Sequence, residues 1–230
     1  MSGSATPRRG RPPRLTRARI LDAALHLADL HGLDGLTMRR LGAELGADPM
    51  AVYGHLPDKA ALVDGLVEVV MAEIVVPEAT GDWASDLRAV TRSARTTLLA
   101  HPAVVPLLGT RPPVTPAAFA LAEAITALLL RAGFTAEQAM DGFDCAGRLV
   151  VGHVLAEAGR PPGGDVDGGE EEHRETQAGL PAETFPALAH VGRSAVRHDP
   201  GRLFELALDG LILALAERRP GRAGRGRGAS

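Results

Sequence analysis

The sequence has one cysteine, few aromatic residues and no long apolar run. Cys145 alone can form neither an internal disulfide nor a cysteine-cluster zinc site. The longest apolar stretch, residues 125–130, is interrupted by Thr126 and is far shorter than the roughly 20 residues that cross a membrane. No hydrophobic segment follows the polar start, so we expect no secretory signal. These absences predict a cytoplasmic protein.

Apolar residues are nevertheless abundant enough to fold the chain. They make up 45% of its 230 residues, while aromatic residues make up only 3%. A core built from Ala and Leu is typical of helices. We see no persuasive strand and no internal repeat, so we predict an all-α fold.

Charge is distributed unevenly along the chain, although the net charge is only −3. Residues 1–20 carry six Arg and residues 218–230 carry five, and neither segment contains an acidic residue. A basic arm before an acidic body indicates nucleic-acid contact confined to one end. A solvated tail that tolerates arginine is an equally open interpretation.

Cap residues and apolar spacing predict ten helices. Four come first and are expected at about residues 16–31, 37–45, 48–55 and 57–76. A joint at residues 77–82 precedes six more, expected at about residues 83–100, 103–108, 116–132, 135–157, 185–194 and 199–218. Residues 109–113 and the Gly-, Pro- and acid-rich residues 159–181 are expected to form loops.

The second and third helices are short and are joined by a turn centred on Gly46, which is typical of a helix-turn-helix. Such a turn projects the second helix, whose width fits the major groove of DNA. An ordinary helical hairpin with a polar surface gives the same pattern. The donors available to phosphates and bases belong to Thr37, Arg39, Tyr53, His55 and Lys59.

Residues 16–74 resemble the N-terminal domain of the TetR family of transcriptional repressors. The resemblance depends on the strings G-L-T-x-R-x-L-x-x-x-L-G at residues 35–46 and V-Y-x-H-L-x-x-K at residues 52–59. Weaker matches, including L-G-T-R-P at residues 108–112, extend to residue 218. They resemble the branch with a tetracycline-repressor-type C-terminal domain.

The resemblance implies DNA contacts for eight residues. Base contacts are implied for Arg39, Pro49, Met50 and Ala51, and phosphate contacts for Thr37, Tyr53, His55 and Lys59. Three of the base-contacting residues are apolar, so we expect them to use thymine methyl groups and DNA shape, with Arg39 recognising guanine. Gly54 replaces a large aromatic residue of the tetracycline-repressor branch, so we expect a different operator.

The resemblance also implies an effector site in the larger domain. Its expected lining is Val90, Leu107, Thr110, Arg111, Phe119, Ile125, Phe143, Asp144 and Arg148. Leu107 stands where the tetracycline-repressor branch has a magnesium-binding histidine, so we expect no metal, no cofactor and a hydrophobic or aromatic effector. The apolar members also suit an ordinary core, and Asp144 and Arg148 suit a surface ion pair.

The histidines do not suggest a metal site, because no two of them have ligand spacing with a carboxylate. We expect His101, which precedes Pro102, to end a helix. Close packing of two helices favours a four-helix dimer interface. The helix at 135–157 contributes the small residues Ala146, Gly147 and Gly152, and the last helix contributes Leu203, Leu206, Ala207, Gly210, Leu211 and Leu213.

The sequence therefore predicts a homodimeric repressor that an effector releases from a palindromic operator. A DNA-binding activator or architectural protein without an effector remains the alternative. An enzyme is not expected, because the chain shows no nucleophile with a base, phosphate loop or metal set. The expected divisions are a disordered basic arm at 1–15, a helix-turn-helix DNA-binding domain at 16–76, an effector-binding and dimerisation domain at 77–218, and a disordered basic tail at 219–230.

Overall fold

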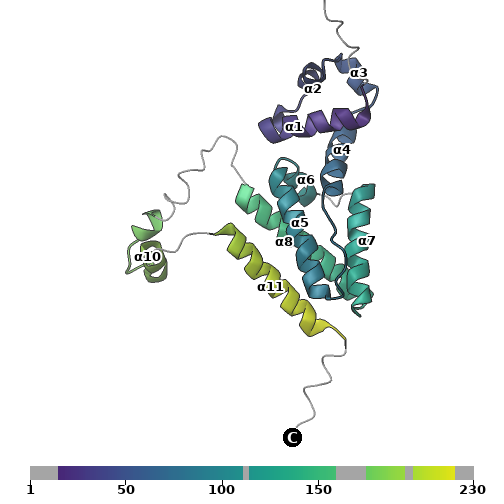
Figure 1. Cartoon of the computed structure of the whole chain (residues 1–230). Coiled ribbons are helices and arrows are strands. Elements are labelled where there is room, and N and C mark those ends of the chain that lie inside the picture. The colour runs from purple at the N-terminus through teal and green to yellow at the C-terminus, as the bar shows by residue number, and fades with distance from the viewer. Residues whose placement is uncertain (1–14, 111–113, 159–174, 195–198, 221–230) are drawn as a thin grey trace, which may run out of the picture.

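The structure is a computed structural model that describes residues 15–110, 114–158, 175–194 and 199–220 (Figure 1). These residues form helices and no strand, which confirms the predicted all-α class. The expected basic arm up to residue 14, the tail from residue 221 and Arg111 lie outside the described residues. None of the described helices is both long enough and apolar enough to cross a bilayer.

The first four helices form a small bundle, residues 15–72, which we call the head. They are α1 (Arg17–Gly35), α2 (Met38–Leu45), α3 (Pro49–Tyr53) and α4 (Lys59–Ala72). Each begins at an N-cap whose side-chain oxygen accepts a backbone N–H, because the first turn of a helix has no partners of its own. The caps are Thr16, Thr37, Asp48 and Asp58.

The described residues from 83 onward are called the body. A larger bundle is formed there by α5 (Trp83–Ala100), α6 (Val105–Thr110), α7 (Pro116–Arg131), α8 (Ala136–Ala158) and α11 (Pro200–Arg218). The short helix α10 (Pro186–Arg193) stands apart from this bundle (Figure 1). A capping box begins α8: the Gln138 N–H donates to the Thr135 hydroxyl, and the Thr135 N–H donates to the Gln138 side-chain oxygen.

Some predicted helix ends were wrong. α4 ends at Ala72 rather than near residue 76, because the chain leaves the helix to run beside α5, where Val75 N–H donates to the Ser93 hydroxyl. α3 ends at Tyr53 rather than His55. α6 extends to Thr110, so part of the expected loop at 109–113 is helical. Residues 175–178, expected in a loop, form a helical turn.

α8 is the central helix of the body and packs against α5, α6, α7 and α11. Figure 1 shows it crossing behind α5, with α7 and α11 on either side. Leu129 of α7 and Phe204 of α11 are almost completely buried in the resulting core. At one end of the body, the Trp83 and Phe134 rings meet edge to face with centroids 4.9 Å apart.

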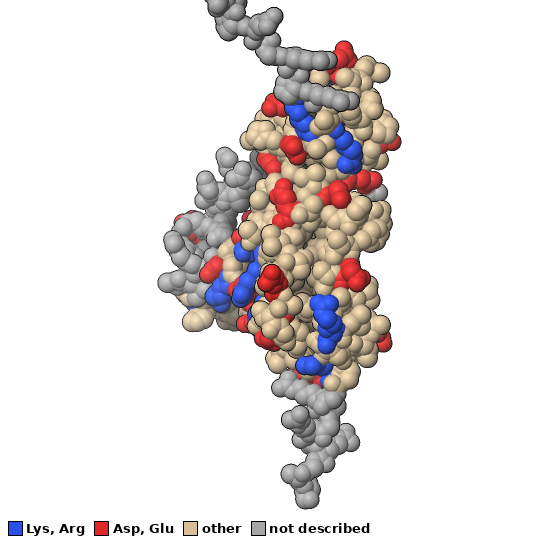
Figure 2. Space-filling view, turned by 45° about the vertical axis from the view of Figure 1, so that its right-hand side comes forward, with Lys and Arg blue, Asp and Glu red and all other residues tan. Residues whose placement is uncertain are grey.

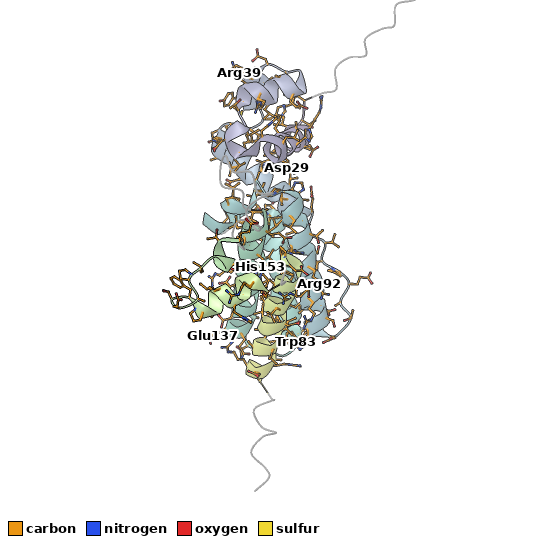
Figure 3. All side chains as sticks on the ribbon, turned by 90° about the vertical axis from the view of Figure 1, so that its left-hand side faces the viewer. Asp29, Arg39, Trp83, Arg92, Glu137 and His153 are labelled. Atoms are coloured by element: carbon orange, nitrogen blue, oxygen red, sulfur yellow. The ribbon has the colours of Figure 1, made fainter. Side chains whose placement is uncertain are left out.

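Ion pairs hold α11 beside α5 at the surface of the core. Arg88 pairs with Asp209, and Arg92 binds both carboxylate oxygens of Glu205 at 2.6 and 2.8 Å. The hydrogen bonds from Arg92 hold the pKa of Glu205 below its usual value. Figure 3 shows Arg92 on the body, well away from Arg39 at the far end of the head.

We expect the core of the body to depend on Leu129. Leu129→Ala removes a fully buried side chain between α7 and α8 and should lower the free energy of unfolding by about 2–4 kcal/mol. The neighbouring Leu130 is 46% exposed, so Leu130→Ala should cost under about 1 kcal/mol. Urea unfolding at one fixed protein concentration measures both. Equal losses for the two variants would contradict this packing.

Candidate DNA-binding and effector sites

The turn between α2 and α3 has the geometry of a helix-turn-helix. Gly46 ends α2 with φ 61°, a left-handed conformation that suits glycine, and Asp48 then caps α3. Leu41 of α2 and Val52 of α3 are fully buried and anchor the two helices to the head. Only one side of α3 is therefore left for a partner.

Gly42 lets α3 lie unusually close to α2. A Cβ at this position would lie 2.9 Å from the Ala47 carbonyl oxygen and 3.3 Å from the Pro49 ring. Ala47 belongs to the turn and Pro49 is the first residue of α3. Any larger residue at position 42 must push the turn and the start of α3 away.

Seven of the eight residues predicted to contact DNA are exposed, and Pro49 is half-buried. Met50 is 73% exposed, which is unusual for so large an apolar side chain without a partner. Figure 3 places Arg39 at the end of the head that is farthest from the body. The helices α2 and α3, which carry five of the predicted residues, lie at that same end of the head (Figure 1).

The two arginines at the start of α2 differ in their contacts. The Arg40 guanidinium donates to the Gly35 carbonyl oxygen at 3.1 Å. The Arg39 side chain is exposed and makes no hydrogen bond or ion pair with any described residue. Nothing in the described part of the chain therefore prevents Arg39 from reaching a base edge or a phosphate.

The predicted effector residues separate into two groups. Val90 and Ile125 are buried, and Leu107 and Phe143 are partly buried against the same core, so α5, α6, α7 and α8 converge there. Phe119 is instead 60% exposed on α7. The Thr110 side chain lies outside the described part of the chain.

Asp144 and Arg148 lie on the surface of α8. The carboxylate and guanidinium are 3.5 Å apart, and their side chains are 49% and 79% exposed. This arrangement matches the alternative interpretation of a surface ion pair between residues four apart on a helix. Such a pair is too open to water to anchor a buried ligand by itself.

The helices expected to form a dimer interface carry an open apolar surface. Leu206 and Leu213 of α11 are 64% and 60% exposed, one turn on either side of Gly210. A Cβ at Gly210, Gly147 or Gly152 would meet no atom within 4 Å. These positions leave room for another helix to approach closely.

The sequence could not show which side chains join the head to the body. Glu68 of α4 is 49 positions from Ala117, yet its carboxylate accepts the backbone N–H of Ala117 at the start of α7. The sequence analysis also did not predict the close approach at Gly42, although a glycine next to Leu41 on the buried side of a short helix is a usable signal.

Among the described residues, no three His, Cys, Asp or Glu side chains group in a way that could hold a metal ion.

Two family patterns cover most of the chain. The family described as "Bacterial regulatory proteins, tetR family" matches residues 20–66. The family described as "Tetracyclin repressor-like, C-terminal domain" matches residues 77–218. The two matched ranges are separated by residues 67–76, which include the end of α4.

Individual relatives match over nearly the full length. The chain is 35% identical over 204 residues to tetracycline repressor protein class A from transposon 1721 of Escherichia coli, covering 87% of this chain and 90% of the relative. It is 29% identical over 224 residues to the HTH-type transcriptional repressor DrrR1 of Streptomyces coeruleorubidus, and the match covers 93% of this chain and 83% of that relative. The solved structure of ActR from Streptomyces coelicolor in complex with actinorhodin has a TM-score of 0.78 at 32% identity, covering 89% of this chain and 98% of that one.

We expect Gly42→Ala to weaken binding to double-stranded DNA at least about tenfold, because the added methyl group displaces α3. Fluorescence anisotropy with a labelled duplex measures the affinity. Glu44→Ala, an exposed change on the same helix, is the control and should not weaken it. Unchanged affinity in a folded Gly42→Ala variant would refute the close approach as a requirement.

Proposed function

Because the chain belongs to the TetR family and is thus a DNA-binding regulator of transcription, we propose that it is a homodimeric repressor released from a palindromic operator by a small, largely apolar effector. Residues 16–76 would bind the operator, and residues 77–218 would bind the effector and form the dimer. We further propose that the protein acts in the cytoplasm, where its DNA lies.

The exposed outer end of the head is the observation that carries this proposal. Arg39 would recognise guanine, while Pro49, Met50 and Ala51 would contact thymine methyl groups. The phosphate contacts would come from Thr37, Tyr53, His55 and Lys59, all of which are exposed.

A dimer is supported by the open surface of α8 and α11. Leu206, Gly210 and Leu213 form an apolar stripe that water covers in a single chain, and burial of such a stripe stabilises association. A twofold dimer presents two copies of α3, so the operator would have two half-sites about one turn of DNA (~34–36 Å) apart.

Effector binding would act on the head through α4. This helix is packed against α1 in the head and against α7 in the body, so a shift of α7 moves α4 and the head with it. An effector that prefers the shifted arrangement draws the dimer toward a spacing of the two α3 helices that no longer fits the half-sites.

The chemistry of the effector follows from the buried residues on α5, α6, α7 and α8. Val90, Leu107, Ile125 and Phe143 are all apolar, so the bound compound should be largely apolar or aromatic. The similarity to a protein solved in complex with actinorhodin supports a small-molecule ligand.

Selection of bound duplexes from a random DNA library, followed by footprinting, tests the operator. We expect a palindrome, and Arg39→Ala should weaken binding to it by about 1–3 kcal/mol and relax the preference at one base pair of each half-site. Arg131→Ala, an exposed arginine of the body, is the control. Aromatic compounds are then screened for release of the duplex. Unselective binding by the parent chain, or equal affinity of parent and Arg39→Ala, would refute the assignment.

The dimer is tested by sedimentation equilibrium. Leu206→Glu with Leu213→Glu places four carboxylates in the proposed twofold interface and should raise the dissociation constant at least about 100-fold. Leu130→Glu introduces the same charge on an exposed site of α7 and should leave the dimer intact. If the double variant dimerises with the same dissociation constant as the parent chain, the dimer interface does not include Leu206 and Leu213.

A further inference from the structure

One histidine joins three elements at the junction of head and body. His101 is the C-cap of α5, as its place before Pro102 predicted. Its Nδ1 lies 2.8 Å from a carboxylate oxygen of Asp29 on α1, and its Nε2 lies 2.9 Å from a carboxylate oxygen of Glu73 at the end of α4. Figure 3 shows Asp29 at the end of the head that faces the body.

These two distances determine the protonation of the ring. An ionised carboxylate only accepts hydrogen bonds, so both ring nitrogens must carry a proton to satisfy both partners. The neutral ring has one N–H and would turn a lone pair toward one of the carboxylates. The arrangement therefore requires the imidazolium cation.

The surroundings favour that cation. The His101 side chain is only 16% exposed, and Asp29 and Glu73 are the charged groups that face it. Burial opposes the charge, but hydrogen bonds and attraction to the two carboxylates outweigh it, so the pKa of His101 is raised above its usual value. On the face drawn in Figure 2, acidic side chains gather where the head meets the body.

We propose that His101 is a positioning residue for DNA binding: its imidazolium ties Asp29 and Glu73 to the body and so fixes the direction in which the head points. Loss of the proton frees one of the two carboxylates and lets the head move about the junction. The contribution is complete below the ordinary histidine pKa of about 6.5 and disappears as the pH rises through the raised value.

This inference deepens the proposed function and is specific to the junction, which contains none of the residues assigned to the effector or to DNA. The head is attached to the body by α4 and the chain that follows it, so the latch formed by His101, Asp29 and Glu73 is a second attachment. It acts on α1 directly, whereas the bond between Glu68 and Ala117 acts on α4 alone.

The test measures the direction of the head without DNA or effector. In the full chain carrying Cys145→Ser, spin labels are attached at Glu44→Cys on α2 and Glu123→Cys on α7, both exposed positions. Labelled chains are diluted with unlabelled ones, and pulsed electron resonance gives the distance distribution at pH 6 and pH 9. We expect one narrow distance at pH 6 and a roughly tenfold gain in displaced heads at pH 9, since a charge-assisted hydrogen bond is lost.

Three variants separate the latch from a purely structural role. Asp29→Asn should keep one narrow distance at both pH values, because an amide can donate to the neutral ring while the ring donates to Glu73. His101→Gln should give displaced heads at both pH values. His26→Gln, an exposed histidine of α1, should respond to pH as the parent does.

The proposal is overturned if the parent chain gives the same distribution at pH 6 and pH 9, or if Asp29→Asn responds to pH as the parent does. Because no DNA is present, the result is independent of the operator experiment. A chain that selects no operator but shows the pH response would refute the proposed function and retain the latch.

Discussion

The position of the head depends on one helix that is packed on two sides. α4 contributes Leu62 and Leu66 to the core of the head, where Gly65 allows close contact with Leu21 of α1. The same helix contacts α7 through Glu68. Close-packed side chains transmit displacement instead of absorbing it, so α4 cannot follow the body without carrying the helix-turn-helix with it. The head therefore moves as a unit.

This constraint explains why a few polar contacts at the junction have large consequences. Arg39 of α2 lies at the far end of the head, so a small rotation about the junction displaces it more than it displaces residues near the junction (Figure 3). An apolar junction resists such rotation only weakly, whereas hydrogen bonds with fixed directions, such as that between Glu68 and Ala117, define an orientation. The interior of each bundle supplies rigidity, and the junction sets the angle between them.

The sequence predicted the fold well because its signals were local. Thr37 and Asp48 marked the starts of α2 and α3, and Gly46 marked the turn, since capping and left-handed turns depend on neighbouring residues alone. The end of α4 was misplaced because a tertiary contact to Ser93 decides it. The contacts of His101 are 72 and 28 positions away in sequence, and no periodicity encodes such pairs. The helix-turn-helix geometry was therefore predictable from local signals, and the contacts at the junction were not.

Electrostatics limits how the molecule can approach DNA. All 28 acidic residues lie outside the arginine-rich ends, so the chain between those ends carries a net negative charge that repels a polyanion. The outer end of the head presents Arg39, Lys59 and apolar Met50 instead. Under the proposed function, discrimination between DNA sequences would rely on the fit between α3 and the groove, and the angle of the head would control that fit.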